Sequence, residues 1–428
     1  MNQFTTSLWG DEAWAATLAI KPFLQIIKIV AKDTSPPLYY LLLHGWMRIF
    51  GSSEIAIRSL SFLFFLATVL TVYFIGKRLW DRKTGLIASL LALTNPFLFT
   101  YAFEGRMYSL LVLTSTLSLY FFLKKHRWGF ILATTAALYT HHFSLFVVIF
   151  EAIWRFKENW GKNLKQFIKS FFDFLIIGLL YLPWFYPLYY QTSLVGSGFW
   201  LGKPTLNIFK ETLQKFLIGS GKEALRQVAY WSIIATLALR RWFREKEKTI
   251  FLLCWFFIPL LLTYLISQFF QSIFYDRYML MVIPASSLLI ASLRRKVSFI
   301  FIFIAIFSLA TLNYYYFLHP TKKPFKELAN FLKQEAKNLP LINYNAAAHH
   351  LWESKYYGLQ APIYAPQPLP FYTGTALMEK GDIIQNLPDE KKIGVITSAR
   401  VEEVEIPGYH QTKTQSFGQL SFIWIEKD

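Results

Sequence analysis

Long apolar windows alternate with short polar connections over most of this chain. Seven windows contain no Asp, Glu, Lys or Arg: residues 59–76, 86–103, 107–123, 174–190, 249–275, 278–293 and 297–318. A helix needs about 20 apolar residues to cross the hydrocarbon core of a bilayer, and somewhat fewer where the membrane thins. The pattern therefore predicts a polytopic α-helical membrane domain.

Two further segments fit the same pattern less simply. Residues 227–239 form a weaker apolar window. Residues 128–154 are too long for one span and too short for two full ones, and the polar Thr140-His141-His142 lies in their middle. We expect two short helices that meet at this turn, which brings the total to about ten spans between residues 57 and 318.

The basic residues cluster in alternate connections, at 77–83, 124–127, 155–165, 240–248 and 294–296. By the positive-inside rule these connections are cytoplasmic, so both chain ends lie outside, as in a multi-pass protein of the plasma (inner) membrane. An external N-terminus requires a preceding span or signal. Residues 1–13 supply neither, so we expect a further spanning helix upstream, direct translocation of a short N-terminal tail being the alternative.

Composition supports a membrane protein and removes several other classes. Hydrophobic residues reach 54% and charged residues only 16%, against about 25% in globular proteins, an excess that no soluble core hides. The net charge of +18 follows the cytoplasmic connections, so it reflects topology and not nucleic-acid binding. The single cysteine, Cys254, excludes an internal disulfide and any CxxC site.

Both ends of the chain have a different character from the spans. Residues 1–56 form a first external loop, in which the segments 14–30 and 38–50 are predicted interfacial helices rich in Trp and Tyr. Residues 319–428 carry ordinary soluble patterning and predict an extracytoplasmic α/β domain. Its expected helices are KPFKELANFLKQEAKNL and AAAHHLWESKYYG, and its expected strands are LINYN, KIGVITSA and LSFIWIEK.

Acidic residues of the first external loop are the first candidates for chemistry. Asp11 and Glu12 stand between two tryptophans in LWGDEAW, either as a solvated helix start or as a general base or metal ligand at the membrane surface. Asp33 precedes Pro36-Pro37, whose fixed φ angles make a turn that directs Asp33 toward the first acids.

Polar residues in two other external connections are further candidates. Glu104 and Arg106 share a tight turn between charge-free spans, either as a topology-setting ion pair or as part of a site. His141 and His142 are metal ligands, phosphate donors or simply interfacial residues.

Arg277 and Tyr278 precede another span. Both side chains suit a phosphate at the level of the lipid headgroups, and aromatic-belt anchoring is the competing interpretation. On the predicted topology all the candidates share one membrane face: Asp11, Glu12, Asp33, Glu104, Arg106, His141, His142, Arg277 and Tyr278. Acids ringed by cations at one interface suit group transfer from an amphiphilic phosphate.

Several segments resemble a known family. LWGDEAW, SPPLYYLLLHGWMRIFGSSEIAIRSLS, AFEGRMYS, ALYTHHFSLFVV and FYDRYMLMVIPA, in this order, resemble the polytopic GT-C glycosyltransferases of the protein O-mannosyltransferase superfamily (family 39 type). That group includes the bacterial aminoarabinose transferases of lipid A. The resemblance covers residues 7–320, and the C-terminal domain carries no matching motif, which leaves the acceptor open.

The resemblance implies an enzyme that moves a sugar from a polyprenyl monophosphate to a hydroxyl of a lipid, glycan or protein of the cell envelope, with inversion. It implies Asp11 as the base, with Glu12, Asp33 and Glu104 shaping the acceptor or binding metal. Arg106, Arg277 and Tyr278 would hold the phosphate. No cofactor is fixed, and a divalent metal ion at Glu12, Glu104 or His141 stays an open alternative.

Two other classes of function remain. A transporter or flippase of lipid-linked sugars would use the same cations without a base, but we find no inverted repeat and expect no charged residue within a span. A non-catalytic protein that presents the α/β domain is the second alternative, and the acidic motif weighs against it.

Overall fold

The computed structural model describes residues 1–239, 245–292, 296–344, 347–365, 367 and 369–428. The chain divides into two compact units. The helical unit contains residues 35–39 and 58–318, and the C-terminal unit contains residues 1–34, 40–57 and 319–428. The first external loop and the predicted α/β domain thus belong to one unit.

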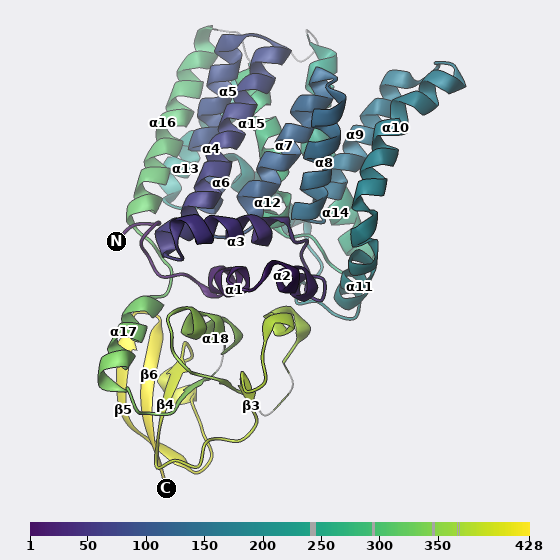
Figure 1. Ribbon diagram of the computed structural model, residues 1–428. Coiled ribbons are helices and arrows are strands. Elements are labelled where there is room, and N and C mark those ends of the chain that lie inside the picture. The colour runs from purple at the N-terminus through teal and green to yellow at the C-terminus, as the bar shows by residue number, and fades with distance from the viewer. Residues whose placement is uncertain (240–244, 293–295, 345–346, 366, 368) are drawn as a thin grey trace. The chain divides into compact units, whose positions relative to one another are not determined.

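Every window that the hydropathy pattern selects in the helical unit contains helix (Figure 1). The helices are α4 (Glu54–Leu79), α5 (Arg82–Thr94), α6 (Pro96–Ala102), α7 (Tyr108–Lys124), α8 (Arg127–Thr140), α9 (Ser144–Asn159), α10 (Leu164–Tyr181), α11 (Phe185–Gly196), α12 (Leu206–Ile218), α13 (Glu223–Ala238), α14 (Lys246–Phe269), α15 (Ile283–Ala291) and α16 (Lys296–Leu318). The two short helices expected to meet at His141 are confirmed as α8 and α9.

Fewer of the observed helices are long and apolar enough to cross a membrane than the ten spans predicted from the sequence. Within the described residues, four helical segments are long and apolar enough to cross a membrane: Glu54–Leu79, Leu164–Gly196, Lys246–Phe269 and Val297–Leu318. The pair α5 and α6, bent by 63°, would make a fifth, and α7 is a shorter apolar helix. The chain is a membrane protein with several apolar helices, and the count of ten spans stays a prediction.

In two windows that are continuous in the hydropathy pattern, the α-helix is interrupted. In 86–103, the Asn95 side chain accepts hydrogen bonds from the backbone N–H groups of Phe97 and Leu98, so that Asn95 ends α5 and starts α6. Pro96 then occupies the first turn, where a missing N–H costs nothing. In 174–190 a 3₁₀ turn over Leu182–Trp184, which contains Pro183, separates α10 from α11.

A buried carboxylate lies in the helix bundle. Glu151 of α9 is completely buried, and Ser118 Oγ donates a hydrogen bond of 2.6 Å to Glu151 Oε1. Ser118 Oγ also lies 2.7 Å from Thr134 Oγ1, which links α7, α8 and α9. The expectation that no predicted span holds a charged residue type is therefore wrong for the window 128–154. Glu151 lies near the end of that window among apolar residues, so the window as a whole still reads as apolar.

The C-terminal unit is an α/β unit, as predicted. Its helices are α1 (Gly10–Ala19), α2 (Phe23–Val30), α3 (Leu38–Phe50), α17 (Phe325–Glu335) and α18 (Ala347–Tyr356). Its strands are β1 (Leu341–Asn343), β2 (Ile363–Tyr364), β3 (Ile383–Ile384), β4 (Lys392–Thr397), β5 (Tyr409–Phe417) and β6 (Leu420–Lys427). The sheet order is β3-β2-β1-β4-β6-β5, with β1 parallel to β2 and β4, and β6 antiparallel to β4 and β5 (Figure 1).

Alternating residues give this sheet two buried faces. On one face Phe325 and Leu332 of α17 pack with Ile396 and Phe422. On the other, residues such as Val395 form a separate apolar cluster. Helix α18 contacts α1, so the acidic motif of the first loop is packed against the α/β fold within this unit.

Other predicted elements differ in extent. The expected interfacial helix 14–30 is two helices, α1 and α2, because the chain turns at residues 20–22 and Pro22 precedes α2. Strands β2, β3 and β5 were not predicted. Some predicted features lie outside the described residues: the basic residues at 240–244 and 294–295, and positions 345–346 of the predicted strand and helix.

Candidate active site

Glu12 anchors the start of α1. Its side chain is completely buried, and Oε2 lies 2.7 Å from Lys322 Nζ. The same oxygen accepts a hydrogen bond of 3.3 Å from the backbone N–H of Trp9, one of the amide groups that a helix start leaves without an intrahelical partner. A buried carboxylate is stable only when it is paired, and Lys322 supplies that pairing.

Asp11 lies beside α18. Its side chain is 24% exposed, and Oδ1 is 4.0 Å from Nδ1 of His349. The His349 ring stacks on the Trp9 ring, with centroids 5.9 Å apart and planes at 28°. Next to them, a Cβ added at Gly10 would lie 2.3 Å from His349 Nδ1, so this close approach of α1 to α18 requires a glycine.

Helix α18 also carries two buried titratable residues, His350 and Glu353. Burial raises the pKa of Glu353 to about 8, with Lys323 opposing and Glu12 adding to the shift. Burial, with Lys323 and His349 nearby, lowers the pKa of His350 to about 3. Among the described residues, neither ring nitrogen of His350 nor Oε2 of Glu353 has a hydrogen-bond partner.

The other acids of the first loop are placed less directly. Asp33 is half-buried in the turn after α2, where its N–H donates to the carbonyl of Val30 at 3.0 Å. Glu54 Oε1 lies 3.0 Å from Lys326 Nζ and accepts a hydrogen bond of 3.2 Å from Tyr357 Oη. A substrate-binding role for Asp33 stays a prediction.

In the helical unit the candidate residues gather around Tyr108, the first residue of α7. Its ring is fully buried and lies 6.3 Å, between centroids, from both His141 and Tyr278. The Arg277 guanidinium lies 5.4 Å from the centre of the Tyr108 ring. Three polar connections that are distant in sequence therefore meet at one tyrosine.

Arg277 lies among aromatic rings. Its guanidinium is 4.9 Å from the centre of the Tyr275 ring and 5.9 Å from that of Tyr278. The neighbouring Asp276 accepts from the Arg277 backbone N–H at 2.7 Å, and its other oxygen pairs with Lys215 Nζ at 2.9 Å. Tyrosine faces attract a guanidinium, so these rings stabilise the position of the Arg277 charge.

The turn between α6 and α7 brings Glu104 and Arg106 to the same cluster. The backbone N–H of Arg106 donates to the carbonyl of Glu104 at 2.7 Å, which closes the turn, and the Glu104 side chain is buried. Arg106 and Arg277 both lie within electrostatic range of the His141 ring. Glu104, Arg106, His141, Arg277 and Tyr278 are thus brought together.

The paired histidines have different surroundings. His141 faces the aromatic cluster, with its centroid 5.1 Å from that of Tyr278. His142 Nε2 lies 2.7 Å from Oε1 of Gln191, and Nδ1 lies 3.4 Å from Tyr181 Oη. His142 therefore joins the α8–α9 turn to α10 and α11.

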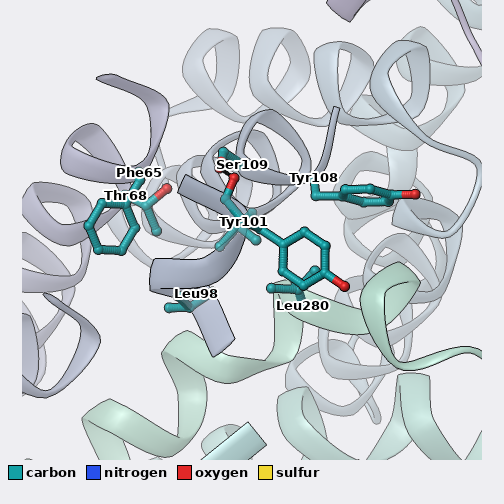
Figure 2. A pocket seen from close by; sticks show the side chains of 8 residues that line it. Phe65, Thr68, Leu98, Tyr101, Tyr108, Ser109 and Leu280 are labelled. Carbon is teal, nitrogen blue, oxygen red and sulfur yellow. Dashed lines mark hydrogen bonds between the residues drawn. The ribbon is translucent and has the colours of Figure 1, made fainter. Parts of the chain in front are cut away.

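A mainly apolar cavity adjoins Tyr108. Figure 2 shows it between Phe65, Leu98 and Leu280, with the rings of Tyr101 and Tyr108 on one side. These two rings meet edge to face at 5.1 Å, and Ser109 Oγ donates to the Tyr101 carbonyl at 2.9 Å. The cationic cluster is therefore bordered by apolar surface.

Comparisons with known proteins agree with the fold. The profile of the family described as dolichyl-phosphate-mannose-protein mannosyltransferase matches residues 34–190, which include Glu104, Arg106 and both histidines. ArnT from Cupriavidus metallidurans, in the apo state, has the same fold with a TM-score of 0.68 and 13% identity, over 98% of this chain and 94% of that one.

The chain has the ArnT-like fold of the GT-C glycosyltransferases.

Other solved structures share this fold. The same ArnT bound to undecaprenyl phosphate matches with a TM-score of 0.65 and 14% identity, over 98% of this chain and 94% of that one. An oligosaccharyltransferase of Archaeoglobus fulgidus, in complex with Zn and sulfate, matches with a TM-score of 0.53 and 14% identity, over 92% of this chain and 64% of that one. No curated protein sequence matches the chain.

The candidate residues fall in both units. Asp11, Glu12 and Asp33 belong to the C-terminal unit, and the remaining six belong to the helical unit. Within the part of the chain that the structure describes, no group of three or more His, Cys, Asp or Glu side chains has the arrangement of a metal site.

Several residues around these sites were not predicted individually. Tyr108 and Tyr275 contact Arg277, and both directly flank predicted motifs, so motif adjacency was the available signal. His349 on α18 carried no such signal, because its contact with Asp11 depends on the packing of two segments from opposite ends of the chain.

Proposed function

We propose that this glycosyltransferase takes its sugar from a polyprenyl-phosphate-linked donor and transfers it, with inversion, to a hydroxyl of a lipid, glycan or protein. The reaction is placed on the extracytoplasmic face of the plasma (inner) membrane. The observation that carries the proposal is the Arg277 guanidinium among three tyrosine rings, with Arg106 and His141 close by.

The helical-unit cluster supplies the donor part of this proposal. A departing polyprenyl phosphate accumulates negative charge, and preorganised cations in a water-poor site stabilise that charge. Arg277 and Arg106 supply guanidinium groups, and Tyr278 supplies a hydroxyl. Apolar side chains, among them Phe65, Leu98 and Leu280, border the cluster beside Tyr101 and Tyr108, and apolar surface suits a lipid-linked donor better than a free nucleotide. The bound undecaprenyl phosphate of the related ArnT structure supports the same lipid class.

Asp11 is assigned as the base. In an inverting transfer a carboxylate takes the proton of the attacking hydroxyl on the face opposite the leaving group. Asp11 is partly exposed, whereas Glu12 is buried and held by Lys322. We therefore assign Glu12 the role of fixing the start of α1, which orients Asp11.

A reconstituted transfer assay tests the function. The full-length protein is supplied with a radiolabelled sugar on undecaprenyl or dolichyl phosphate, together with envelope lipids and glycans from a deletion strain. We expect transfer from a prenyl-phosphate sugar and no transfer from the corresponding nucleotide sugar. Mass spectrometry of the deletion strain is expected to show an accumulated prenyl-phosphate sugar and a missing modification. Nucleotide-sugar dependence would overturn the donor assignment.

One observation favours a second candidate, a transporter or flippase of lipid-linked sugars. Glu151 is a completely buried carboxylate in the bundle, and such residues often mark transport pathways. The two candidates differ in which substitution matters. Transport predicts loss of lipid flipping in Glu151→Gln and none in Asp11→Asn, whereas transfer predicts loss of glycosylated product in Asp11→Asn.

A further inference from the structure

A second cavity lies in the helical unit, at the end of α7 opposite Tyr108. Its lining comes from the end of α7, the start of α8, the last turns of α9, the connection to α10, the middle of α10 and the start of α14, and its volume is about 490 Å³. Helix α7 has 17 residues, so at 1.5 Å per residue about 25 Å separates this cavity from the Tyr108 cluster. The two are therefore different sites.

Positive charge predominates in this cavity once its ion pairs are counted. The cations of the lining are Lys125, Arg127, Arg155 and Lys162, beside His126, and the acids are Glu158, Asp173 and Glu247.

Each acid of the lining has a partner. Asp173 pairs with Arg127 at 2.7 Å, and Glu247 pairs with Lys157 at 3.2 Å. Glu158 accepts a hydrogen bond from the Trp154 indole. Lys125, Arg155 and Lys162 are thus left as the cations that an anionic ligand would meet, and Lys162 Nζ also donates to Asn159 Oδ1 at 2.9 Å.

Arg155 is held in place by aromatic rings. Its guanidinium lies 4.6 Å from the centre of the Phe122 ring and 6.0 Å from that of Phe130. The buried Nε of Arg155 has no hydrogen-bond partner among the described residues. A buried N–H group without a partner is costly, and an acceptor such as a phosphate oxygen would remove that cost.

Lys125 stands at a backbone position that favours glycine. Its φ is 56°, the only positive φ at a non-glycine residue in the described part of the chain, and it ends α7. Glycine is the residue that most easily takes this left-handed conformation at a helix end. The chain instead places a cation there, in the lining of the cavity.

The surface next to the cavity is apolar. Trp128 and Leu132 of α8 are 60% and 63% exposed, and Phe172 and Leu175 of α10 are 48% and 56% exposed. Phe172 also contacts the guanidinium of Arg127, at 5.3 Å from its ring centre. A ligand with both a phosphate and acyl chains would satisfy the cations and cover these side chains, whereas free phosphate would do only the first.

We propose that this cavity binds the phosphate headgroup of an anionic phospholipid, with the acyl chains along α8 and α10. The proposal is independent of the sugar-transfer function. Its residues lie at connections that the charge pattern places on the cytoplasmic side, and basic pockets between helices on that side bind anionic headgroups.

Lipid titrations of the purified full-length protein in neutral detergent test the proposal, with native mass spectrometry and thermal unfolding as readouts. The probes are phosphatidylglycerol, phosphatidylcholine and inorganic phosphate. We expect saturable binding and stabilisation with phosphatidylglycerol alone. Equal responses to phosphatidylglycerol and phosphatidylcholine would overturn the proposal, as would inorganic phosphate that competes at the same concentration as the lipid.

Substitutions locate the binding. Arg155→Gln is expected to weaken phosphatidylglycerol binding by about tenfold or more, the usual effect of losing a charge-assisted hydrogen bond. Lys125→Gly removes a second cation at a position whose backbone suits glycine, so it should weaken binding while the lipid-free protein keeps its unfolding temperature. Lys165→Gln, on exposed α10 outside the lining, is the matched control and should bind normally. Equal losses in all three variants would indicate diffuse attraction and refute the site.

Discussion

Asp11 Oδ1 lies 4.0 Å from Nδ1 of His349, so the acidic motif near the N-terminus contacts a helix of the C-terminal α/β fold. The contact lies beside Gly10, where any side chain would clash with His349, and beside Trp9, which stacks on the same imidazole. The α/β fold thus supplies a side chain next to the proposed base.

Substitutions of the two adjacent acids separate catalysis from stability. Asp11→Asn keeps the shape of the side chain but cannot accept a proton, so turnover should fall by about 10²–10⁴ while donor binding survives. Glu12→Gln breaks the buried pair with Lys322, so we expect mainly a lower unfolding temperature. Steady-state transfer and thermal unfolding are measured on both variants.

Three outcomes would contradict this assignment. A full-rate Asp11→Asn enzyme removes Asp11 as the base. Reversed effects of the two substitutions would make Glu12 the base. Rescue of both variants by excess divalent ion would indicate that the acids bind a metal.

The close packing at Gly10 has its own test. Gly10→Ala should lower the unfolding temperature and transfer activity, because its Cβ would lie 2.7 Å from the His349 backbone Cα, which cannot yield as a side chain can. Gly45→Ala in α3 is the control, since no atom lies within 4 Å of its added Cβ. That variant should be neutral or stabilised by roughly 0.5–1 kcal/mol. Equal behaviour of the two alanine variants would contradict the predicted clash.

The donor cluster predicts a loss of binding. Arg277→Gln should weaken binding of a prenyl-phosphate sugar by roughly 1.5–3 kcal/mol, about tenfold to a hundredfold, because it removes a charge-assisted hydrogen bond to phosphate. The same titration on Arg106→Gln shows whether Arg106 also holds phosphate or only stabilises its turn. Lys215→Gln, which removes a cation paired to Asp276, is the control. Unchanged binding in Arg277→Gln would exclude Arg277 from the donor site.

Hydropathy predicted the helices well because a charge-free window in a bilayer has no other stable conformation. It missed the break at Asn95, because side-chain capping leaves no trace in a hydropathy average. Strand β5 (Tyr409–Phe417) was missed because its side chains are mostly exposed on both faces, and only pairing with β6 defines it as a strand.

In the candidate site, too, the sequence identifies some residues, and only the tertiary structure identifies others. Arg277 and Glu104 were identifiable as charges beside apolar windows. Tyr108, however, is one aromatic residue in a chain that is 19% aromatic, and only its place beside the turn of Glu104 and Arg106 distinguishes it. His349 becomes significant only through the packing of α18 on α1, which depends on tertiary structure.

The predicted orientation is testable with reporters. An alkaline phosphatase fused after Asp428 should be active, because the alternation of basic connections places the C-terminal residues outside the cytoplasm. The same reporter inserted in the connection at 124–127 should be inactive, and a fluorescent protein that folds only in the cytoplasm should give the opposite pattern. Cytoplasmic activity at Asp428 from a full-length gene would refute the ten-span topology.

Glu353 and His350 predict a pH dependence of stability with a defined sign. The pKa of Glu353 rises from 4.5 in its ordinary state to about 8 in the fold, so its stabilising contribution is complete below pH 4.5 and is lost as the pH rises to about 8. The pKa of His350 falls from 6.5 to about 3, so its contribution is complete above pH 6.5 and is lost as the pH falls. The two trends oppose each other between pH 4.5 and 6.5, and above pH 6.5 only the Glu353 trend of these two remains.

The difference in unfolding temperature between the parent protein and Glu353→Gln, measured between pH 6.5 and 8, therefore isolates the contribution of Glu353. The unsubstituted protein should lose stability as the pH rises through this interval, because the buried carboxyl must ionise with only Lys323 to oppose burial and Glu12 adding repulsion. Glu353→Gln stays neutral and should flatten the decline, with its largest relative stabilisation near pH 8. Glu379→Gln is the control, because that carboxylate is exposed and paired with Lys21 and its pKa is already lowered. An identical decline in the parent and in Glu353→Gln would show that another group governs the alkaline side.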